Sequence, residues 1–226
     1  MSDAPLSMTE CVVCQGATQS LLDSQIRRGV TFVTYHVCLR CGFTMKDATA
    51  FPSPDEEKTQ YDYHENTPDN TGYVAMFERF ITHAIEPFVA PTRVLDYGSG
   101  PGPVLLDCLR RVGFDGVGYD PFYQPDTSVL KTRYPLIVST EVFEHFHDPM
   151  ATLEAIDRLL EVGGHLAVMT RLRPASDQAF LDWWYRRDST HVAFYTMAAF
   201  DYIAKQFHWH LLHSDGQSCF TFQKQG

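Results

Sequence analysis

Short runs of apolar residues recur from residue 93 onward, each bounded by glycine, proline or polar residues. Runs of this length and boundary are typical of strands that are buried on both faces. They predict strands at 93–97, 116–120, 136–139 and 165–170, a weaker strand at 128–130, and a closing antiparallel hairpin from 209–213 and 218–222.

Between these runs, apolar residues recur at spacings of three and four, as on one face of a helix. The segment 73–85 has this spacing, and Pro87 ends it. Further helices are predicted at 104–112, 150–160 and 197–207. The alternation of strands and helices predicts an α/β fold with a doubly wound, mostly parallel, seven-stranded sheet. In such sheets ligands bind beyond the carboxyl ends of the strands.

The first third of the chain has a different organisation. Residues 1–10 predict a disordered tail, and 11–46 hold two cysteine pairs with a β-rich stretch at 29–37. Residues 47–72 are rich in proline, aspartate and threonine, which predicts a linker or loop, part of which packs through its aromatic residues. The main domain is then expected over 73–226.

Composition adds several constraints. With 226 residues, 44% hydrophobic and 20% charged, and a mean hydropathy of −0.21, the chain suits one α/β domain and a small appendage. No apolar run approaches the ~20 residues that cross a membrane, and the first ten residues lack the pattern of a secretory signal. We therefore expect a cytoplasmic protein without membrane contact. The net charge of −10 argues against nucleic acid as a partner and leaves the oligomeric state open.

The stretch Val94-Leu-Asp-Tyr-Gly-Ser-Gly-Pro-Gly102 is the most informative about a ligand. A strand delivers Asp96 to its carboxyl end, and three glycines then open the turn into a helix, where backbone can approach a ligand closely. The G-x-G-x-G spacing differs from the G-x-G-x-x-G of pyrophosphate-binding loops, and Asp96 suits a cationic ligand better than a phosphate. Further on, Asp120 ends the second strand, where a carboxylate can accept hydrogen bonds from ribose hydroxyls.

These residues resemble the class I S-adenosylmethionine-dependent methyltransferases over 73–226. The glycine stretch is similar to their first motif, Gly118-Tyr-Asp120 to their second-strand acidic motif, and 139–149 (STEVFEHFHDP) to the segment after their fourth strand. The resemblance implies S-adenosylmethionine as the cofactor and leaves the adenine contacts open. It implies cofactor contacts from Asp96, Tyr97, Gly98, Ser99, Gly100, Gly102, Asp120, Pro121, Thr140 and Glu141.

The two cysteine pairs, Cys11-x2-Cys14 and Cys38-x2-Cys41, have a spacing close to that of zinc ribbons. Four thiolates close a tetrahedral Zn²⁺ site with no open position, so the predicted role is structural. The alternative is two reduced pairs without metal. The segment also resembles the N-terminal zinc ribbon of some bacterial methyltransferases, which implies a lid or a wall on the substrate side.

Glu141, Glu144 and His145 would share one face if their segment were helical, and His191 follows the fifth strand. This set resembles the metal site of the small-RNA 2′-O-methyltransferases, and a similar E-x-x-E-H occurs in quinone O-methyltransferases. The resemblance implies an ion such as Mn²⁺ or Zn²⁺. The interpretation given more weight is that these catalytic candidates shape the pocket without metal, with His191 or Glu141 accepting a proton.

The loop after the fifth strand carries an aromatic cluster, which either walls a flat or sugar-like acceptor or simply packs beneath the loop. Its members are Trp183, Trp184, Tyr185, Phe194 and Tyr195. Nearby arginines raise the hypothesis of an anionic acceptor, in which alanine at Arg186 and Arg187 weakens acceptor binding and leaves cofactor affinity unchanged. The other two arginines are Arg171 and Arg173.

Together these features predict methyl transfer from S-adenosylmethionine to a small-molecule acceptor, expected to be an oxygen nucleophile that is sugar-like or aromatic. Two alternatives belong to other classes. One is a non-catalytic module of the same fold that recruits a partner through its zinc ribbon. The other is an NAD-dependent oxidoreductase, against which the G-x-G-x-G spacing and Asp96 both count.

Overall fold

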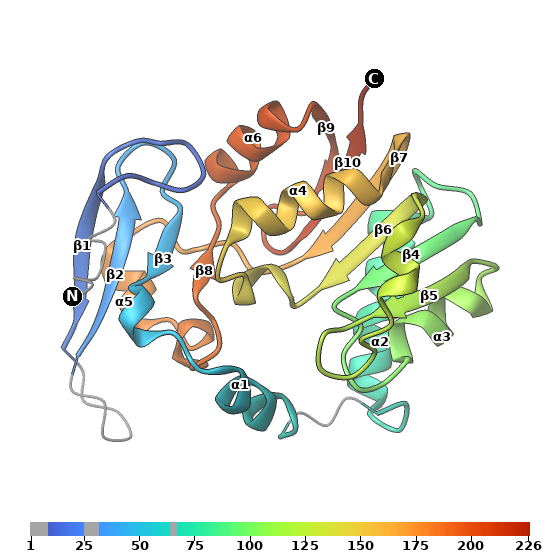
Figure 1. Cartoon of the computed structure of the whole chain (residues 1–226), viewed down its shortest axis with the longest axis horizontal. Helices are drawn as coiled ribbons and strands as arrows, with labels where there is room; N and C mark the ends of the chain where they lie inside the picture. The colour runs from blue at the N-terminus through green and yellow to red at the C-terminus, as the bar shows by residue number, and fades with distance from the viewer. Residues whose placement is uncertain (1–8, 25–31, 64–66) are drawn as a thin grey trace.

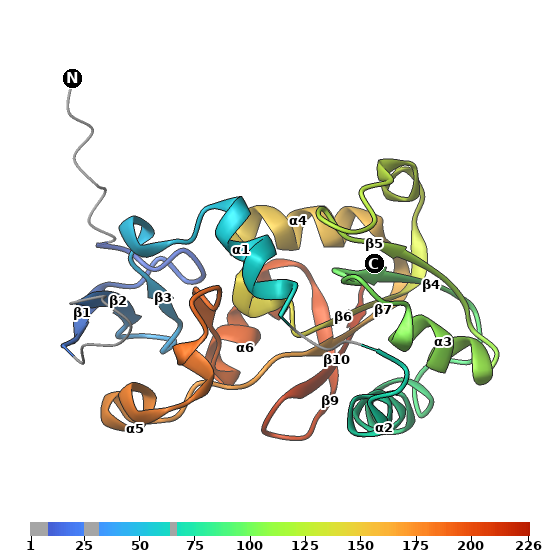
Figure 2. The same ribbon diagram turned by 90° about the horizontal axis from the view of Figure 1, so that it is seen from below.

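The computed structural model describes residues 9–24, 32–63 and 67–226. Most of the tail predicted at 1–10 therefore lies outside the described residues. Two β-sheets stand side by side, a small one formed mainly by the N-terminal segment and a larger one formed by strands from residue 93 onward (Figure 1). The short helix α1 (Pro54–Tyr61) lies in the region between the two sheets in both views (Figures 1 and 2).

The larger sheet has the predicted mostly parallel arrangement. Strands β5, β4, β6 and β7 are parallel, and β10 pairs antiparallel with both β7 and β9, as expected of a closing hairpin. In spatial order, the strands are β5 (Asp115–Tyr119), β4 (Arg93–Tyr97), β6 (Tyr134–Thr140), β7 (Leu160–Met169), β10 (Cys219–Lys224) and β9 (Trp209–Ser214).

Alternate strand residues face opposite layers of the core. Val94 and Val138 pack with helices α2 (Thr71–Phe80) and α3 (Val104–Arg111), whereas Leu95 and Ile137 pack with α4 (Pro149–Leu159) and α6 (Met197–Gln206). Both faces of the sheet are thus covered by helices, which explains the nearly continuous apolar runs in the sequence. A π-helical turn, Ile81–Ile85, extends α2 and completes the helix predicted over 73–85.

The expectation of seven strands is wrong, because the larger sheet has six strands among the described residues. The stretch predicted as a strand at 128–130 lies in a 3-10 helix, Thr127–Lys131. Asp126 caps this helix by accepting a hydrogen bond from the Ser128 backbone N–H. Such local capping by aspartate satisfies the backbone without a neighbouring strand, so β5 is left at the edge of the sheet.

The small sheet combines segments that are far apart in the sequence. Its spatial order is β1 (Thr18–Asp23), β2 (Val33–Cys38), β3 (Thr44–Lys46) and β8 (Ala193–Phe194), all antiparallel. The predicted β-rich stretch corresponds to β2, and its first residues, 29–31, lie outside the described residues. Since β8 comes from the loop after β7, backbone pairing attaches the cysteine-bearing segment to that loop.

The predicted linker at 47–72 contains ordered helices. A 3-10 turn, Ala48–Ala50, precedes α1, which begins with Pro54 and a capping box between Ser53 and Glu56. The loop after β7 forms α5 (Asp177–Asp182) and a 3-10 turn, Tyr185–Arg187. Among the residues with described positions, no helix has the length and apolar character needed to span a bilayer.

Candidate functional site

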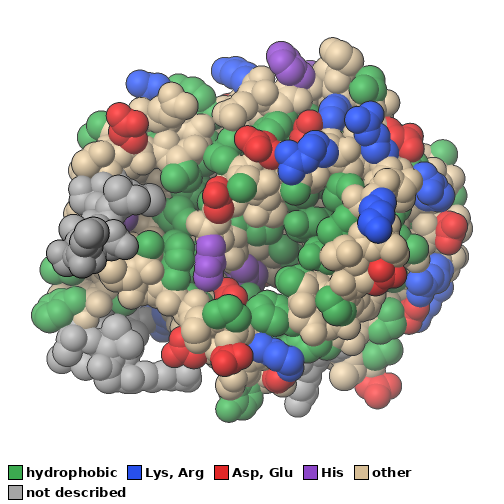
Figure 3. Space-filling view, viewed as in Figure 1, with side chains coloured by type: hydrophobic (Ala, Val, Ile, Leu, Met, Phe, Trp, Pro, Cys, Tyr) green, Lys and Arg blue, Asp and Glu red, His purple; other side chains and the backbone are tan. Residues whose placement is uncertain are grey.

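A cavity of about 1330 Å³ opens at the carboxyl ends of β4, β5 and β6 and extends to the small sheet. Its walls come from the glycine loop, from α1 and from the segment 184–191. On the face shown in Figure 3, histidine and acidic side chains gather with hydrophobic ones near the middle of the molecule. One continuous space therefore joins the predicted cofactor loop to the loop that carries His191.

The glycine loop follows β4 directly and rests on the end of β5. The backbone N–H groups of Gly98 and Ser99 donate to Tyr119 O at 2.8 and 3.1 Å. Gly98 has φ 86°, and a Cβ there would lie 2.4 Å from the Val142 side chain. Gly100 also has positive φ, 65°, and has open space beside it. Gly98 is thus required by packing, whereas Gly100 leaves the cavity side of the loop clear.

Asp120 ties two loops together at the edge of the cavity. Its Oδ1 accepts hydrogen bonds from the backbone of Phe122 and Tyr123, at 2.8 and 3.1 Å, and its Oδ2 accepts one from Gly100 at 3.0 Å. The carboxylate is therefore already ordered by the protein. Oδ1 uses both of its lone pairs in this way, whereas Oδ2 keeps a second lone pair with which to accept a further donor.

Asp96 is the unusual group of the site. It is buried, and its Oδ1 has no hydrogen-bond partner among the described residues, as is also true of Ser99 Oγ in the same loop. Burial, followed by the charge of Asp120, raises the pKa of Asp96 to about 7. A buried carboxylate oxygen without a partner is costly. This corner of the cavity therefore fits a ligand that brings a cationic hydrogen-bond donor.

Glu141 and Glu144 both lie within hydrogen-bond distance of the Tyr185 hydroxyl group. Tyr185 Oη donates to Glu144 Oε1 at 2.5 Å and lies 3.2 Å from Glu141 Oε2, while Thr170 Oγ1 donates to Glu144 Oε2 at 2.8 Å. Burial raises the pKa of both carboxyl groups, and that of Glu141 to about 8, the neighbouring Glu144 adding to the effect. Only Phe143–His145 is helical, and Glu141 has φ 54°, so proximity here does not arise from a shared helix face.

The two histidines face each other with a defined tautomer. His145 Nδ1 lies 3.0 Å from Thr190 O, and His191 Nδ1 lies 2.7 Å from Tyr185 O. A carbonyl oxygen can only accept, so each Nδ1 carries the hydrogen and each Nε2 keeps its lone pair. Burial lowers the pKa of both rings, that of His191 to about 3, with the nearby His145 contributing. Both imidazoles are therefore neutral near pH 7.

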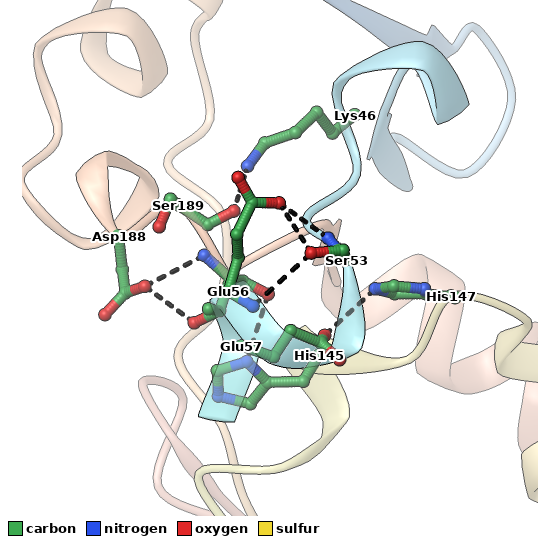
Figure 4. A network of polar contacts seen from close by, with 9 residues as sticks. Lys46, Ser53, Glu56, Glu57, His145, His147, Asp188 and Ser189 are labelled. Atoms are coloured by element: carbon green, nitrogen blue, oxygen red, sulfur yellow. Dashed lines mark hydrogen bonds and ion pairs between the residues drawn. The ribbon is translucent and has the colours of Figure 1, made fainter. Parts of the chain in front are cut away.

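Helix α1 supplies a wall that the sequence pattern did not predict (Figure 4). Glu57 pairs with His147 at 3.0 Å, and Gln60 Nε2 donates to Asp188 at 3.4 Å. The Tyr61 ring packs edge-on against His145, with ring centres 5.2 Å apart. The missed signal was Ser53-Pro-Asp-Glu56, in which a serine cap, a proline at the first position and a glutamate three residues later mark a helix start.

Lys46, at the end of β3, is a second feature that the pattern did not reveal. Its Nζ donates to Ser189 O at 2.7 Å, and burial lowers the pKa of its ammonium group to about 8 (Figure 4). It places the cysteine-bearing segment at the cavity, alongside Asp188 and Ser189.

The aromatic cluster divides between packing and cavity wall. Phe194 and Tyr195 are buried in the core, which accounts for them as packing residues. Tyr185 and Trp184 line the cavity, and Trp184 is 60% exposed beneath the guanidinium of Arg171. Trp183 is partly buried and packs beside Phe180 and Phe194, so of the five predicted rings, all of which are described, Trp184 and Tyr185 are the two that line the cavity.

Arg186 borders the cavity, but its guanidinium is buried and its Nη1 pairs with Asp23 at 2.5 Å, which gives this charge a structural role in place of the predicted contact with an anionic acceptor. Arg186→Ala is expected to lower the free energy of unfolding by about 3 kcal/mol, since a buried carboxylate loses this partner. Arg187→Ala, at an exposed neighbour that lines the cavity, should stay within about 0.5 kcal/mol of the parent. Chemical denaturation measures both, and equal stability of the two variants would contradict the assignment.

The four paired cysteines converge in the small sheet, and all six cysteines of the chain are free thiols. Cys11 and Cys41 have their sulfurs 3.7 Å apart, Cys14 and Cys38 3.4 Å, and all four lie within 4.8 Å of one another. The edge of a tetrahedron with Zn–S bonds of ~2.3 Å is about 3.8 Å. The donor set and its spacing therefore fit a tetrahedral zinc ion.

Comparison with protein families matches residues 71–214 to a family described as a methyltransferase domain. A search of curated proteins gives no match. The matched segment contains the glycine loop, Asp120 and His191, and it covers well over half of the chain.

Solved structures with a similar fold share little sequence with this chain. The 1,6-didemethyltoxoflavin N1-methyltransferase of Burkholderia thailandensis, which holds S-adenosylhomocysteine, is 13% identical (TM-score 0.52; 86% of this chain and 96% of that chain covered). Magnesium protoporphyrin IX methyltransferase of Synechocystis PCC 6803, also with S-adenosylhomocysteine, is 12% identical (0.52; 75% and 93%). Mitomycin 7-O-methyltransferase is 14% identical (0.52; 76% and 58%). At these identities the likeness shows the fold.

Proposed function

Because the chain belongs to the family of methyltransferase domains, we propose that it transfers the methyl group of S-adenosylmethionine to an oxygen nucleophile of a small-molecule acceptor. The observation that supports this most is that Oδ1 of buried Asp96 has no hydrogen-bond partner among the described residues. Asp96 precedes the glycine loop, and the cavity that it lines also reaches His191. The structural neighbours named above include enzymes that methylate oxygen and nitrogen in small molecules.

We assign the cofactor to the glycine-loop end of the cavity. Asp96 and Ser99 would receive the ammonium group of the methionine part, which supplies the donors that their orphaned oxygens lack. The backbone from Gly98 to Gly102 leaves room for a ligand to lie against it, and Asp120 would accept from the ribose hydroxyls. The remaining proposed contacts are Tyr97, Pro121, Thr140 and Glu141, all of which line the cavity.

The proposed chemistry depends mainly on position. When bound, S-adenosylmethionine supplies an electrophilic methyl group, whose bonding electrons to sulfur return to sulfur as the acceptor oxygen attacks. The chain's own part is to hold the acceptor in line and exclude water, which converts a bimolecular reaction into an intramolecular one. The proposed groups to take the acceptor's proton are His191, whose Nε2 keeps a lone pair, and Glu141, whose carboxyl group lines the same cavity.

We further propose that residues 11–46 form a zinc ribbon with a structural ion held by Cys11, Cys14, Cys38 and Cys41. Support comes from the near-tetrahedral spacing of the four sulfurs. Backbone N–H groups of Arg40 and Cys41 donate to Cys38 Sγ at 3.3 Å, so the chain turns tightly around this sulfur. The ribbon would wall the acceptor end of the cavity through Lys46.

Calorimetric titration with S-adenosylmethionine and, separately, with NAD tests the proposal. We expect one S-adenosylmethionine site with micromolar affinity, roughly −8 kcal/mol, and no heat from NAD. A screen of hydroxyl, amine and carbon acceptors with labelled cofactor then identifies the nucleophile. Absence of S-adenosylmethionine binding would favour the non-catalytic module, and NAD binding would favour the oxidoreductase.

A further inference from the structure

We propose that Lys46 binds a carboxylate group of the acceptor, so that the acceptor is a small organic acid that is held by this group and methylated at another oxygen. Lys46 is the last residue of β3, and only 5% of it is exposed although it lines the cavity. That the carboxylate belongs to the acceptor rests on the proposed function, whereas binding of a carboxylate at Lys46 does not.

Two hydrogen bonds fix Lys46 against the segment that carries His191. Its backbone N–H donates to Val192 O at 2.8 Å, and its Nζ donates to Ser189 O at 2.7 Å (Figure 4). These two carbonyls lie on either side of His191 in the chain. The charge of Lys46 also acts on the His191 ring, where it contributes to the lowered pKa of the imidazole. An anion bound to Nζ would therefore lie near the proposed proton acceptor.

The ammonium group of Lys46 has more donors than the protein uses. An ammonium group carries three N–H donors. Among the described residues, Nζ donates one hydrogen bond, and the oxygen that accepts it is a neutral carbonyl. Burial lowers the pKa of Lys46 to about 8, although the charge of Asp188 acts in the opposite direction. Buried charges are normally paired, so an anionic oxygen on a ligand would compensate this one.

The acidic side chains of the same cavity wall have other partners. Asp188 accepts hydrogen bonds from the backbone N–H and the Oγ1 of Thr190, at 2.9 and 2.6 Å. Glu57 pairs with His147 at 3.0 Å. Among the described residues, neither carboxylate accepts a hydrogen bond from Lys46. The protein's own acids therefore leave two N–H donors of the ammonium group to a ligand.

The charges around Lys46 favour a ligand with a single negative charge. Asp188 and Glu57 line the same wall and repel a doubly charged phosphate more strongly than a carboxylate. Arg187 also lines this wall, but it is exposed, so water and salt screen its attraction for an anion. The two remaining donors of Nζ can each reach one carboxylate oxygen in a charge-assisted hydrogen bond.

The position of Lys46 separates the carboxylate from the reacting oxygen. Lys46 belongs to the small sheet, whereas the glycine loop follows β4 of the larger sheet (Figure 1). The rings of Trp184 and Tyr185 line the same cavity and suit a flat body on the acceptor. We therefore assign the carboxylate to binding, and the attack on the methyl group to a different oxygen of the same molecule.

Benzoate and benzamide are matched probes for this site, because they have nearly the same shape and only benzoate is charged. In titrations of the full chain followed by NMR, the wild type should bind benzoate at least about tenfold more tightly than benzamide. Lys46→Met keeps an unbranched side chain without the charge, and it should bind the two probes equally. The matched control is Lys205→Met, at an exposed position of α6, which should keep the wild-type preference.

Three results would overturn the proposal. One is equal affinity of the wild type for the two probes, and another is a preference for benzoate that survives in Lys46→Met. The third is tighter binding of phenyl phosphate than of benzoate, which would assign the site to a phosphate. A measurement on the wild type alone avoids dependence on how the variant folds: with ¹⁵N-labelled lysine, benzoate should shift one side-chain ammonium signal that benzamide leaves in place, and the absence of such a signal rejects the site.

S-adenosylmethionine titrated into the same samples separates this proposal from the proposed function. Binding of the cofactor without a preference for benzoate rejects the carboxylate site alone. A preference for benzoate without binding of the cofactor rejects the proposed function alone.

Discussion

Asp96→Asn is expected to weaken the binding of S-adenosylmethionine by about 30- to 1000-fold, roughly 2–4 kcal/mol. The carboxylate is buried, its Oδ1 has no partner among the described residues, and removal of one member of a buried charge pair costs this much. Asp115→Asn is the matched control, because it removes the same charge at the amino end of β5, where the chain is exposed. Calorimetry should find cofactor affinity unchanged in the control.

The pH dependence provides an independent check on Asp96. Its pKa in the folded protein is about 7, raised mainly by burial, and a cation binds the ionised form. Affinity of the wild type should therefore rise between about pH 6 and 8 and then level off, and the asparagine variant should lack this dependence. A wild-type affinity that is flat over this range, or equal affinities of the two proteins, would remove Asp96 from the cofactor site.

Without ligand, the contribution of Asp96 to the free energy of unfolding should fall as the pH rises, whereas cofactor affinity rises. A folded-state pKa above the ordinary value of 3.8 means that the contribution of Asp96 is fully present below about pH 4 and is lost as the pH rises toward 7. Asparagine does not ionise, so without ligand the variant should be more stable than the wild type at pH 8, by about 2–4 kcal/mol. Thermal unfolding at two pH values measures this difference.

Much of the main fold followed from periodicity, because strands buried on both faces leave long apolar runs and the helices that cover them leave regular spacings. The strands at 93–97 and 136–139 and the helix at 197–207 are examples. The prediction of a strand at 128–130 was wrong, because its apolar residues, Val129 and Leu130, pack onto the core from a 3-10 helix. Three residues are too few to show whether apolar positions repeat with the period of a strand or of a helix.

The site was predictable where it lies on continuous motifs and unpredictable where it depends on distant segments. The loop from Asp96 to Gly102 and the carboxylate of Asp120 follow their strands directly. In contrast, Glu144 meets Tyr185 and His145 meets Thr190 across about 40 residues, through turns that no local pattern specifies. The pairing of β3 with β8, which brings Lys46 to the cavity, is equally non-local.

Replacing both Cys38 and Cys41 with serine is expected to remove the proposed zinc and unfold the small sheet. Structural zinc sites contribute on the order of 10 kcal/mol to folding, more than a sheet of short strands such as β3 can replace. Cys219→Ser is the matched control, because this half-buried thiol lies on β10, outside the group of four. Metal analysis should find zinc in the wild type and the control but none in the double variant, and hydrogen exchange should show lost protection in β1 and β2.

The effect should reach the acceptor end of the cavity and spare the cofactor end. The Lys46 backbone N–H donates to Val192 O, and the Val192 N–H donates to Glu144 O, both at 2.8 Å, so the small sheet is joined through backbone to the segment that carries Glu144. The glycine loop instead rests on Tyr119 of the main sheet. The double variant should therefore bind S-adenosylmethionine like the wild type, and its rate of methyl transfer to the acceptor should fall. Loss of cofactor binding as well would mean that the cysteine-bearing segment supports the whole domain, and zinc-free wild-type protein with full hydrogen-exchange protection would mean that the sheet does not depend on a metal.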